Sequence, residues 1–130
     1  MRTIINRLAG FVFLLLVFSF TRVYGQENKT LSYPEFIKKA KETNGQLIDI
    51  RTPQEYASGH LSDSRLINFL APDFAENISK LDKDGHYFLY CRSGNRSNKA
   101  LKQMEDMGFK NVYHLQGGVI GMEARQALVK

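Results

Sequence analysis

Short apolar runs alternate with amphipathic segments along the chain after residue 30. The runs have the length and composition of buried strands. The segments between them repeat apolar residues at helical spacing, with charged residues on the opposite face. This alternation predicts an α/β fold in which a parallel sheet carries helices on both faces. The predicted strands are residues 46–50, 65–69, 86–90 and 111–115, with a short edge strand that ends at Leu31.

The predicted helices begin and end at familiar signals. Ser32 is suited to cap the first helix, Glu35 completes a capping box, and Pro34 fits the first turn. Asn44-Gly45 is a good end for that helix. The further helices are expected to start at Gln54 and to span residues 73–80, 96–107 and 122–129.

The first 25 residues differ in composition from the rest of the chain. Arg2 and Arg7 precede residues 8–20, which are almost wholly apolar. An apolar core of roughly 7–15 residues behind a positive start is typical of a secretory signal peptide. A membrane-spanning helix needs about 20 apolar residues. A span over residues 4–24 would have to include Arg7 and Arg22.

Val23 and Gly25 occupy the third and first places before a possible cleavage site at Gln26. We therefore expect residues 1–25 to be a signal peptide and residues 26–130 to be the mature domain. The protein is then periplasmic or secreted, without stable membrane insertion after cleavage. An uncleaved membrane anchor stays open as the alternative.

The net charge of +5 belongs mostly to this leader. The leader holds three of the 18 basic residues and no acidic residue, so 15 basic and 13 acidic residues remain, a net charge of +2. A chain of 130 residues with this balance predicts one globular domain and no nucleic-acid partner.

Cys91 is the single cysteine of the chain and directly follows the strand predicted at residues 86–90. It has no partner for an internal disulfide, so the bland alternative is a buried core cysteine. The residues after Cys91 favour a reactive thiol in an anion-binding loop instead. Backbone amides of residues 92–96 before a helix can bind an anion, and Gly94 allows the tight curl. Arg92 and Arg96 add positive charge, which favours a thiolate.

A thiolate in such an anion-binding loop is expected to attack electrophiles that carry negative charge. Thiosulfate-type sulfur, phosphate esters and arsenate all meet this description. Ligands of parallel sheets bind beyond the carboxyl ends of the strands. Cys91, Asp49 with Arg51, and residues 116–118 all follow predicted strands, so these loops are expected to converge at one edge.

A metal site is not expected. The three histidines, His60, His86 and His114, lie in separate segments and match no metal-ligand spacing.

Three segments together resemble the rhodanese-type sulfurtransferases. The first resembles the active-site loop of that family, and the others resemble its earlier and closing signatures. The first is Tyr90-Cys91-Arg92-Ser93-Gly94-Asn95-Arg96-Ser97 with Ala100; the second is Leu47-Ile48-Asp49-Ile50-Arg51 with Glu55-Tyr56 and Gly59-His60-Leu61; the third is Gly108-Phe109 with Val112 and Leu115-Gln116-Gly117-Gly118. One departure is Ser62-Asp63-Ser64, where the family more usually has Pro-Gly-Ala.

The resemblance implies a small α/β domain with a five-stranded parallel sheet, closest to exported single-domain members. It implies that Cys91 takes sulfur from a small anionic donor such as thiosulfate and passes it to cyanide or a thiol, including a protein thiol. The mechanism that it implies needs neither a metal nor an organic cofactor. The substrate-binding residues that it implies are Arg92, Ser93, Gly94, Asn95 and Arg96. Asp49 and Arg51 either tie the neighbouring loop to this edge or form an ordinary ion pair.

Loop length separates the alternatives. Four residues lie between Cys91 and Arg96, whereas related phosphatases and arsenate reductases have five. The shorter loop favours a sulfur atom held on the cysteine over a tetrahedral phosphate. A non-catalytic or redox-sensing rhodanese-like binding module is the main alternative, and a phosphatase or arsenate reductase is the weaker one.

Overall fold

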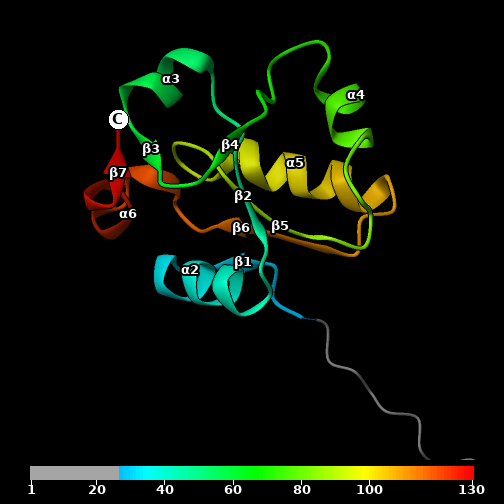
Figure 1. Ribbon diagram of the computed structural model, residues 1–130, viewed down its shortest axis with the longest axis horizontal. Helices are drawn as coiled ribbons and strands as arrows, with labels where there is room; N and C mark the ends of the chain where they lie inside the picture. The colour runs from blue at the N-terminus through cyan, green and yellow to red at the C-terminus, as the bar shows by residue number, and fades with distance from the viewer. Residues whose placement is uncertain (1–26) are drawn as a thin grey trace, which may run out of the picture.

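The computed structural model describes residues 27–130, so the predicted signal peptide and its cleavage site lie outside the described residues. Five strands of this part form one parallel sheet in the order β1-β6-β5-β2-β4 (Figure 1). This confirms the predicted α/β fold with a five-stranded parallel sheet. The strands are β1 (Thr30–Leu31), β2 (Gln46–Asp49), β4 (Arg65–Leu66), β5 (His86–Tyr90) and β6 (Asn111–Leu115).

Helices cover both faces of the sheet, as predicted. In Figure 1, α4 and α5 lie above the sheet, and α2 lies below it. No helix within residues 27–130 is long and apolar enough to cross a membrane. The helices are α2 (Tyr33–Glu42), α3 (Pro53–Ser58), α4 (Phe74–Ser79), α5 (Asn95–Asp106) and α6 (Met122–Gln126), with a 3-10 turn, η1 (Gly118–Ile120).

The central strand β5 is apolar on both faces because both faces are covered. Leu89 and Cys91 pack in the core formed with α4 and α5. Phe88 and Tyr90 pack in the second core, which includes residues of α2 and α6. A parallel strand that is buried on both sides reads as a continuous apolar run, which is the pattern that predicted it.

The start of α2 follows the predicted capping box. The Ser32 side chain accepts a hydrogen bond from the Glu35 amide at 3.4 Å, and the Glu35 carboxylate accepts one from the Ser32 amide at 3.1 Å. The helix ends at Glu42, and the turn after it places Asn44 at φ 50°. The sequence therefore marked both ends of this helix to within a few residues.

Two of the predicted elements are corrected. The strand predicted at residues 65–69 ends at Leu66, although the amides of Ile67 and Phe69 still donate to the carbonyls of Asp49 and Ile50. The helix predicted at residues 122–129 ends at Gln126.

The residues beyond that helix form β7 (Leu128–Val129), which pairs antiparallel with β3 (His60–Leu61). Gly59 precedes β3 with a φ of 151° and lies against Leu128. This pairing joins segments distant in sequence, so local helical spacing carries no sign of it.

Tyr90 ties the buried end of β5 to the chain around β3. Its hydroxyl accepts a hydrogen bond from the Leu61 amide at 3.0 Å and lies 2.8 Å from Ser64 Oγ. Burial raises the pKa of Tyr90, so the phenol stays protonated.

We expect Tyr90→Phe to lower the free energy of unfolding by about 1–3 kcal/mol, because it leaves the buried Leu61 amide without its partner. Tyr87→Phe is the matched control. Its hydroxyl donates to the Asp82 carbonyl at 2.6 Å in a partly buried place where water can substitute, so the loss should be about 1 kcal/mol or less. Urea denaturation measures both, and equal losses would contradict this role of Tyr90.

Candidate active site

Cys91 lies at the carboxyl end of β5 with its residue only 1% exposed. Its sulfur accepts hydrogen bonds from the backbone amides of Gly94 at 3.1 Å and Ser97 at 3.4 Å. The loop of residues 91–94 therefore curls around the sulfur, as the sequence predicts for an anion-binding loop. Two N–H groups directed at one sulfur favour a negative charge there.

The curl depends on Gly94 and on the helix that follows it. Gly94 is buried with a φ of 95°, a left-handed conformation that other residues rarely adopt. Helix α5 begins at the next residue, Asn95, so the sulfur lies at a helix N-terminus. The positive end of the helix dipole adds to the field of the two amides.

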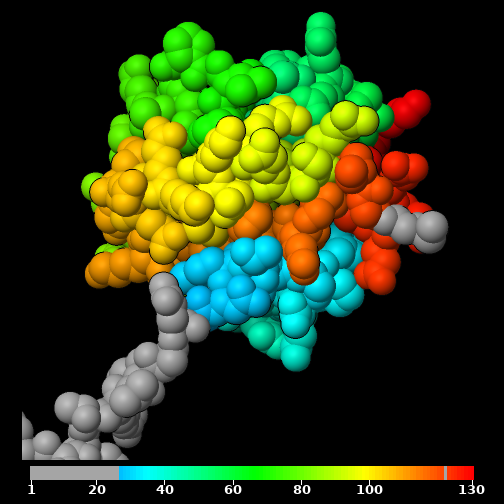
Figure 2. Space-filling view, turned by 180° about the vertical axis from the view of Figure 1, so that it is seen from behind, coloured from blue at the N-terminus to red at the C-terminus, as the bar shows by residue number. Residues whose placement is uncertain are grey.

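The segment after β6 holds this loop in place. The Val119 amide donates to the Cys91 carbonyl at 3.0 Å, and the Ile120 amide donates to the Arg92 carbonyl at 3.1 Å. Gly118 has a φ of 64° and lies so close to Arg92 that a side chain would collide with its carbonyl. In Figure 2, the yellow-green loop and the orange segment lie side by side at the surface. The predicted convergence of these two loops is therefore present.

A hydrogen-bonded chain leads away from the sulfur beneath the loop. Ser97 Oγ lies 3.5 Å from Cys91 Sγ and 2.9 Å from His114 Nδ1. His114 Nε2 lies 3.0 Å from Thr30 Oγ1. His114 is only 5% exposed, and burial lowers the pKa of its imidazole, which keeps it neutral.

The sequence does not identify these two residues as parts of the site. Ser97 belongs to the loop motif without a predicted role of its own, and the spacing of His114 speaks only against a metal ligand. The available signal was a histidine inside the apolar run that forms β6. Such a residue needs a polar partner when buried.

Arg96 forms a two-pronged ion pair with Glu55 of α3. Its two terminal nitrogens lie 2.8 and 2.9 Å from the two carboxylate oxygens. The hydrogen bonds from Arg96 lower the pKa of Glu55 to about 2. The guanidinium thus joins α5 to α3, and donor binding by Arg96 stays a prediction.

The other predicted substrate-binding side chains lie at the rim of the loop. Arg92, Ser93 and Asn95 are exposed to solvent, whereas Gly94 contributes its backbone amide from a buried position. Arg92 is therefore the arginine of the loop most open to an incoming anion.

Asp49 and Arg51 form a buried ion pair at the end of β2. Arg51 Nη2 lies 2.7 Å from Asp49 Oδ2 and also donates to the Gly59 carbonyl at 2.7 Å. The pair therefore ties the loop before β3 to the sheet edge. None of its hydrogen bonds reaches Cys91. The geometry therefore agrees both with an ordinary ion pair and with a link between the neighbouring loop and this edge of the sheet.

Residues 27–130 contain no group of three or more His, Cys, Asp and Glu side chains that could hold a metal ion. His60 instead stacks on Tyr56, with ring centroids 3.7 Å apart. This geometry gives His60 a structural role in the turn between α3 and β3.

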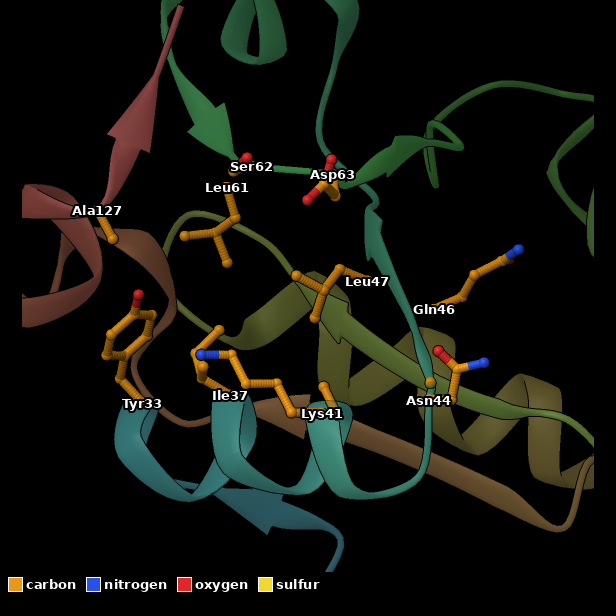
Figure 3. A pocket seen from close by; sticks show the side chains of 12 residues that line it. Tyr33, Ile37, Lys41, Asn44, Gln46, Leu47, Leu61, Ser62, Asp63 and Ala127 are labelled. Atoms are coloured by element: carbon orange, nitrogen blue, oxygen red, sulfur yellow. The ribbon is translucent and has the colours of Figure 1, made fainter.

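A cavity away from the loop of Cys91 does not include the thiol in its lining. It has a volume of about 520 Å³ and lies between α2, β2 and the chain around β3 (Figure 3). Ile37, Leu47 and Leu61 form its apolar wall, with Lys41 and Asp63 nearer its rim. A smaller cavity of about 320 Å³ includes Gly118 and therefore borders the loop of Cys91.

Residues 32–124 match the family described as "Rhodanese-like domain". The chain is 40% identical over 86 residues to "Thiosulfate sulfurtransferase GlpE" of Pseudomonas aeruginosa, a match that covers 65% of this chain and 76% of the relative.

Two solved structures are similar as well. A rhodanese-like domain protein from Staphylococcus aureus is 27% identical with a TM-score of 0.62, over 71% of this chain and 88% of that one. A Rhodopseudomonas palustris protein described as a possible tyrosine phosphatase is 30% identical with a TM-score of 0.59, over 77% and 81%.

We expect Gly118→Ala to lower the free energy of unfolding by about 2–4 kcal/mol, because backbone strain adds to a collision with Arg92. Gly117→Ala is the matched control. Gly117 has a φ of 71°, but a side chain there would meet nothing within 4 Å, so only the strain of about 1 kcal/mol remains. Urea denaturation measures the loss of stability in both variants. Similar losses would contradict the predicted collision between a side chain at position 118 and Arg92.

We expect Glu55→Gln to reduce stability in a pH-dependent way. The pKa of Glu55 falls from 4.5 to about 2 on folding, so the unfolded state binds more protons between these values. The ion pair therefore stabilises the fold fully above about pH 4.5, and this contribution is lost as the pH falls toward about 2.

Above pH 5 the variant should be less stable by about 1–2 kcal/mol. The difference in free energy of unfolding between the wild type and the variant should become smaller near pH 2. Denaturation across this range measures the difference, and a difference that is independent of pH would contradict the predicted role of the Glu55 carboxylate.

Proposed function

The chain belongs to the rhodanese-like domain family, and from that premise we propose that it is a sulfurtransferase whose Cys91 carries the transferred sulfur as a persulfide. Sulfurtransferase activity follows from the family and from the 40% identical thiosulfate sulfurtransferase. The persulfide on Cys91, the donor and the acceptor are the parts that we propose.

The observation that carries this proposal is the pair of backbone amides directed at the sulfur of Cys91, at 3.1 and 3.4 Å. These donors need no side-chain charge and no movement of the loop, so they stabilise an anionic sulfur without reorganisation. The four-residue spacing between Cys91 and Arg96 makes a small loop. Such a loop suits a single added sulfur better than a tetrahedral oxyanion.

In the first half-reaction, the Cys91 thiolate attacks the outer sulfur of a donor such as thiosulfate. A new sulfur–sulfur bond forms on Cys91, the sulfur–sulfur bond of the donor breaks, and sulfite leaves with the bonding electron pair. The persulfide keeps one negative charge, which now lies on the outer sulfur, within the field of the loop amides and of the N-terminus of α5. Arg92, exposed at the rim, attracts the doubly negative donor.

In the second half-reaction, a nucleophilic acceptor attacks the outer sulfur of the persulfide. A cyanide acceptor then leaves as thiocyanate. A thiolate acceptor, which can belong to a protein, leaves as a persulfide. The electron pair of the broken bond returns to Cys91, which regenerates the thiolate. Both half-reactions balance without a metal or an organic cofactor.

A phosphatase is the second candidate, because one similar structure carries the description "possible tyrosine phosphatase". Hydrolysis of an aryl phosphate without sulfur uptake would favour it. Normal folding with neither activity would favour a non-catalytic or redox-sensing binding module.

We further propose that the protein acts in the periplasm or outside the cell. The support is the composition of residues 1–25, with two early arginines before an apolar stretch. Expression of the full chain followed by intact mass measurement tests this, and a mature protein that begins at Gln26 is the expected result.

We expect incubation with thiosulfate to add the mass of one sulfur atom to the purified mature protein. Cys91→Ala and Cys91→Ser should both remain unmodified, since neither can form the persulfide. Later addition of cyanide should remove the extra mass from the wild type. Intact mass spectrometry reads all three results. An unmodified wild-type mass, with the thiol shown to be reduced, would rule out the persulfide carrier.

A further inference from the structure

The contacts of Ser97 Oγ exceed what one hydroxyl proton can satisfy. The oxygen lies 3.5 Å from Cys91 Sγ, 2.9 Å from His114 Nδ1 and 3.1 Å from the Gly94 carbonyl. A hydroxyl has one proton to donate and two lone pairs that accept. The Gly94 carbonyl accepts a hydrogen bond from the Asn98 amide at 3.0 Å and has a second lone pair for Ser97. The single proton of Ser97 is therefore shared among the Gly94 carbonyl, the sulfur and His114.

His114 decides this division through its tautomer. A neutral imidazole has one nitrogen with a proton and one without. With the proton on Nδ1, the ring donates to Ser97, and the hydroxyl no longer donates to the ring. An anionic sulfur then attracts the hydroxyl proton more strongly than the neutral Gly94 carbonyl does. With the proton on Nε2, the ring donates to Thr30 at 3.0 Å, and Ser97 must donate to Nδ1.

The imidazole is in a setting that keeps it neutral. Both of its side-chain contacts, Ser97 and Thr30, are neutral hydroxyl groups. The charged side chains of the adjoining elements are paired elsewhere or exposed. Arg96 pairs with Glu55, Lys29 pairs with Glu27, and Arg92 lies at the exposed rim.

We propose that His114 is a positioning residue that directs the Ser97 hydroxyl toward an anionic sulfur on Cys91. The sulfur then has three donors: the amides of Gly94 and Ser97 and the hydroxyl of Ser97. The role of His114 in sulfur transfer rests on the proposed function. Its effect on the thiolate does not, because the thiolate forms without any sulfur donor.

The protons balance in this arrangement. In the thiol state, the sulfur donates to Ser97, Ser97 donates to Nδ1, and Nε2 donates to Thr30. In the anionic state, each of these hydrogen bonds is reversed: Thr30 donates to Nε2, Nδ1 donates to Ser97, and Ser97 donates to the sulfur. The anionic state holds one proton fewer than the thiol state, because the thiol proton has passed to solvent. The direction of the hydrogen bonds along Ser97, His114 and Thr30 thus changes with the charge on the sulfur.

The test measures alkylation of Cys91 by iodoacetamide across pH 5 to 10, which needs no sulfur donor. We expect His114→Leu to react about tenfold more slowly at pH 7, because the thiolate loses a charge-assisted hydrogen bond. His114→Asn keeps an N–H beside Ser97 and should stay within about threefold of the wild type. His86→Leu, at the opposite end of β5, is the matched control and should leave the profile unchanged.

A double variant separates positioning from general disruption. Ser97→Ala should slow alkylation as His114→Leu does, and the pair of changes together should be no slower than Ser97→Ala alone. Ser97→Thr keeps the hydroxyl and should restore the rate. Circular dichroism confirms folding, and if His114→Leu does not fold, the Ser97 variants and His114→Asn decide the question. Multiplicative slowing in the double variant, or wild-type alkylation in His114→Leu, would overturn the proposal.

The ring itself gives an independent readout. In protein with ¹⁵N-labelled histidine, we expect Nδ1 of His114 to carry the proton above the pH at which the thiol ionises. A proton on Nε2 in that state would overturn the proposal. Normal sulfur uptake alongside that result would refute only the role of His114. A correct tautomer without sulfur uptake would refute only the proposed transfer.

Discussion

The close packing of the Cys91 loop against the segment after β6 is the constraint on which the site depends. Val119 and Ile120 donate their amides to the carbonyls of Cys91 and Arg92. With those carbonyls held outward, the chain turns at Gly94 and directs its later amides at the sulfur. Because a side chain at position 118 would collide with Arg92, this arrangement requires glycine on the facing segment.

The sulfur is surrounded by backbone dipoles more than by charged side chains. Arg96 is held by Glu55, and Arg51 is held by Asp49, so the main positive groups near the sheet edge are paired. The direct contacts of the sulfur are two amides and a hydroxyl. A fixed set of dipoles stabilises charge as it develops, without reorganisation of the site.

The burial of Cys91 bears on the compartment proposed for the protein. A lone thiol outside the cytoplasm is exposed to oxidation and has no partner cysteine in this chain. At 1% exposure, Cys91 presents little surface to an oxidant. Burial of this kind limits contact between the thiol and an oxidant.

The sequence by itself determined the layered α/β fold, the capping box of α2 and the position of Cys91 at a strand end. These features follow from local spacing, because apolar periodicity and capping act over a few residues. The sequence did not show the link from Ser97 to His114 and Thr30, nor the strand pair at the C-terminus. Thr30 and His114 are 84 residues apart in the chain and meet only because β1 pairs with β6. The order of strands in the sheet, which no local pattern specifies, therefore decided what surrounds the sulfur.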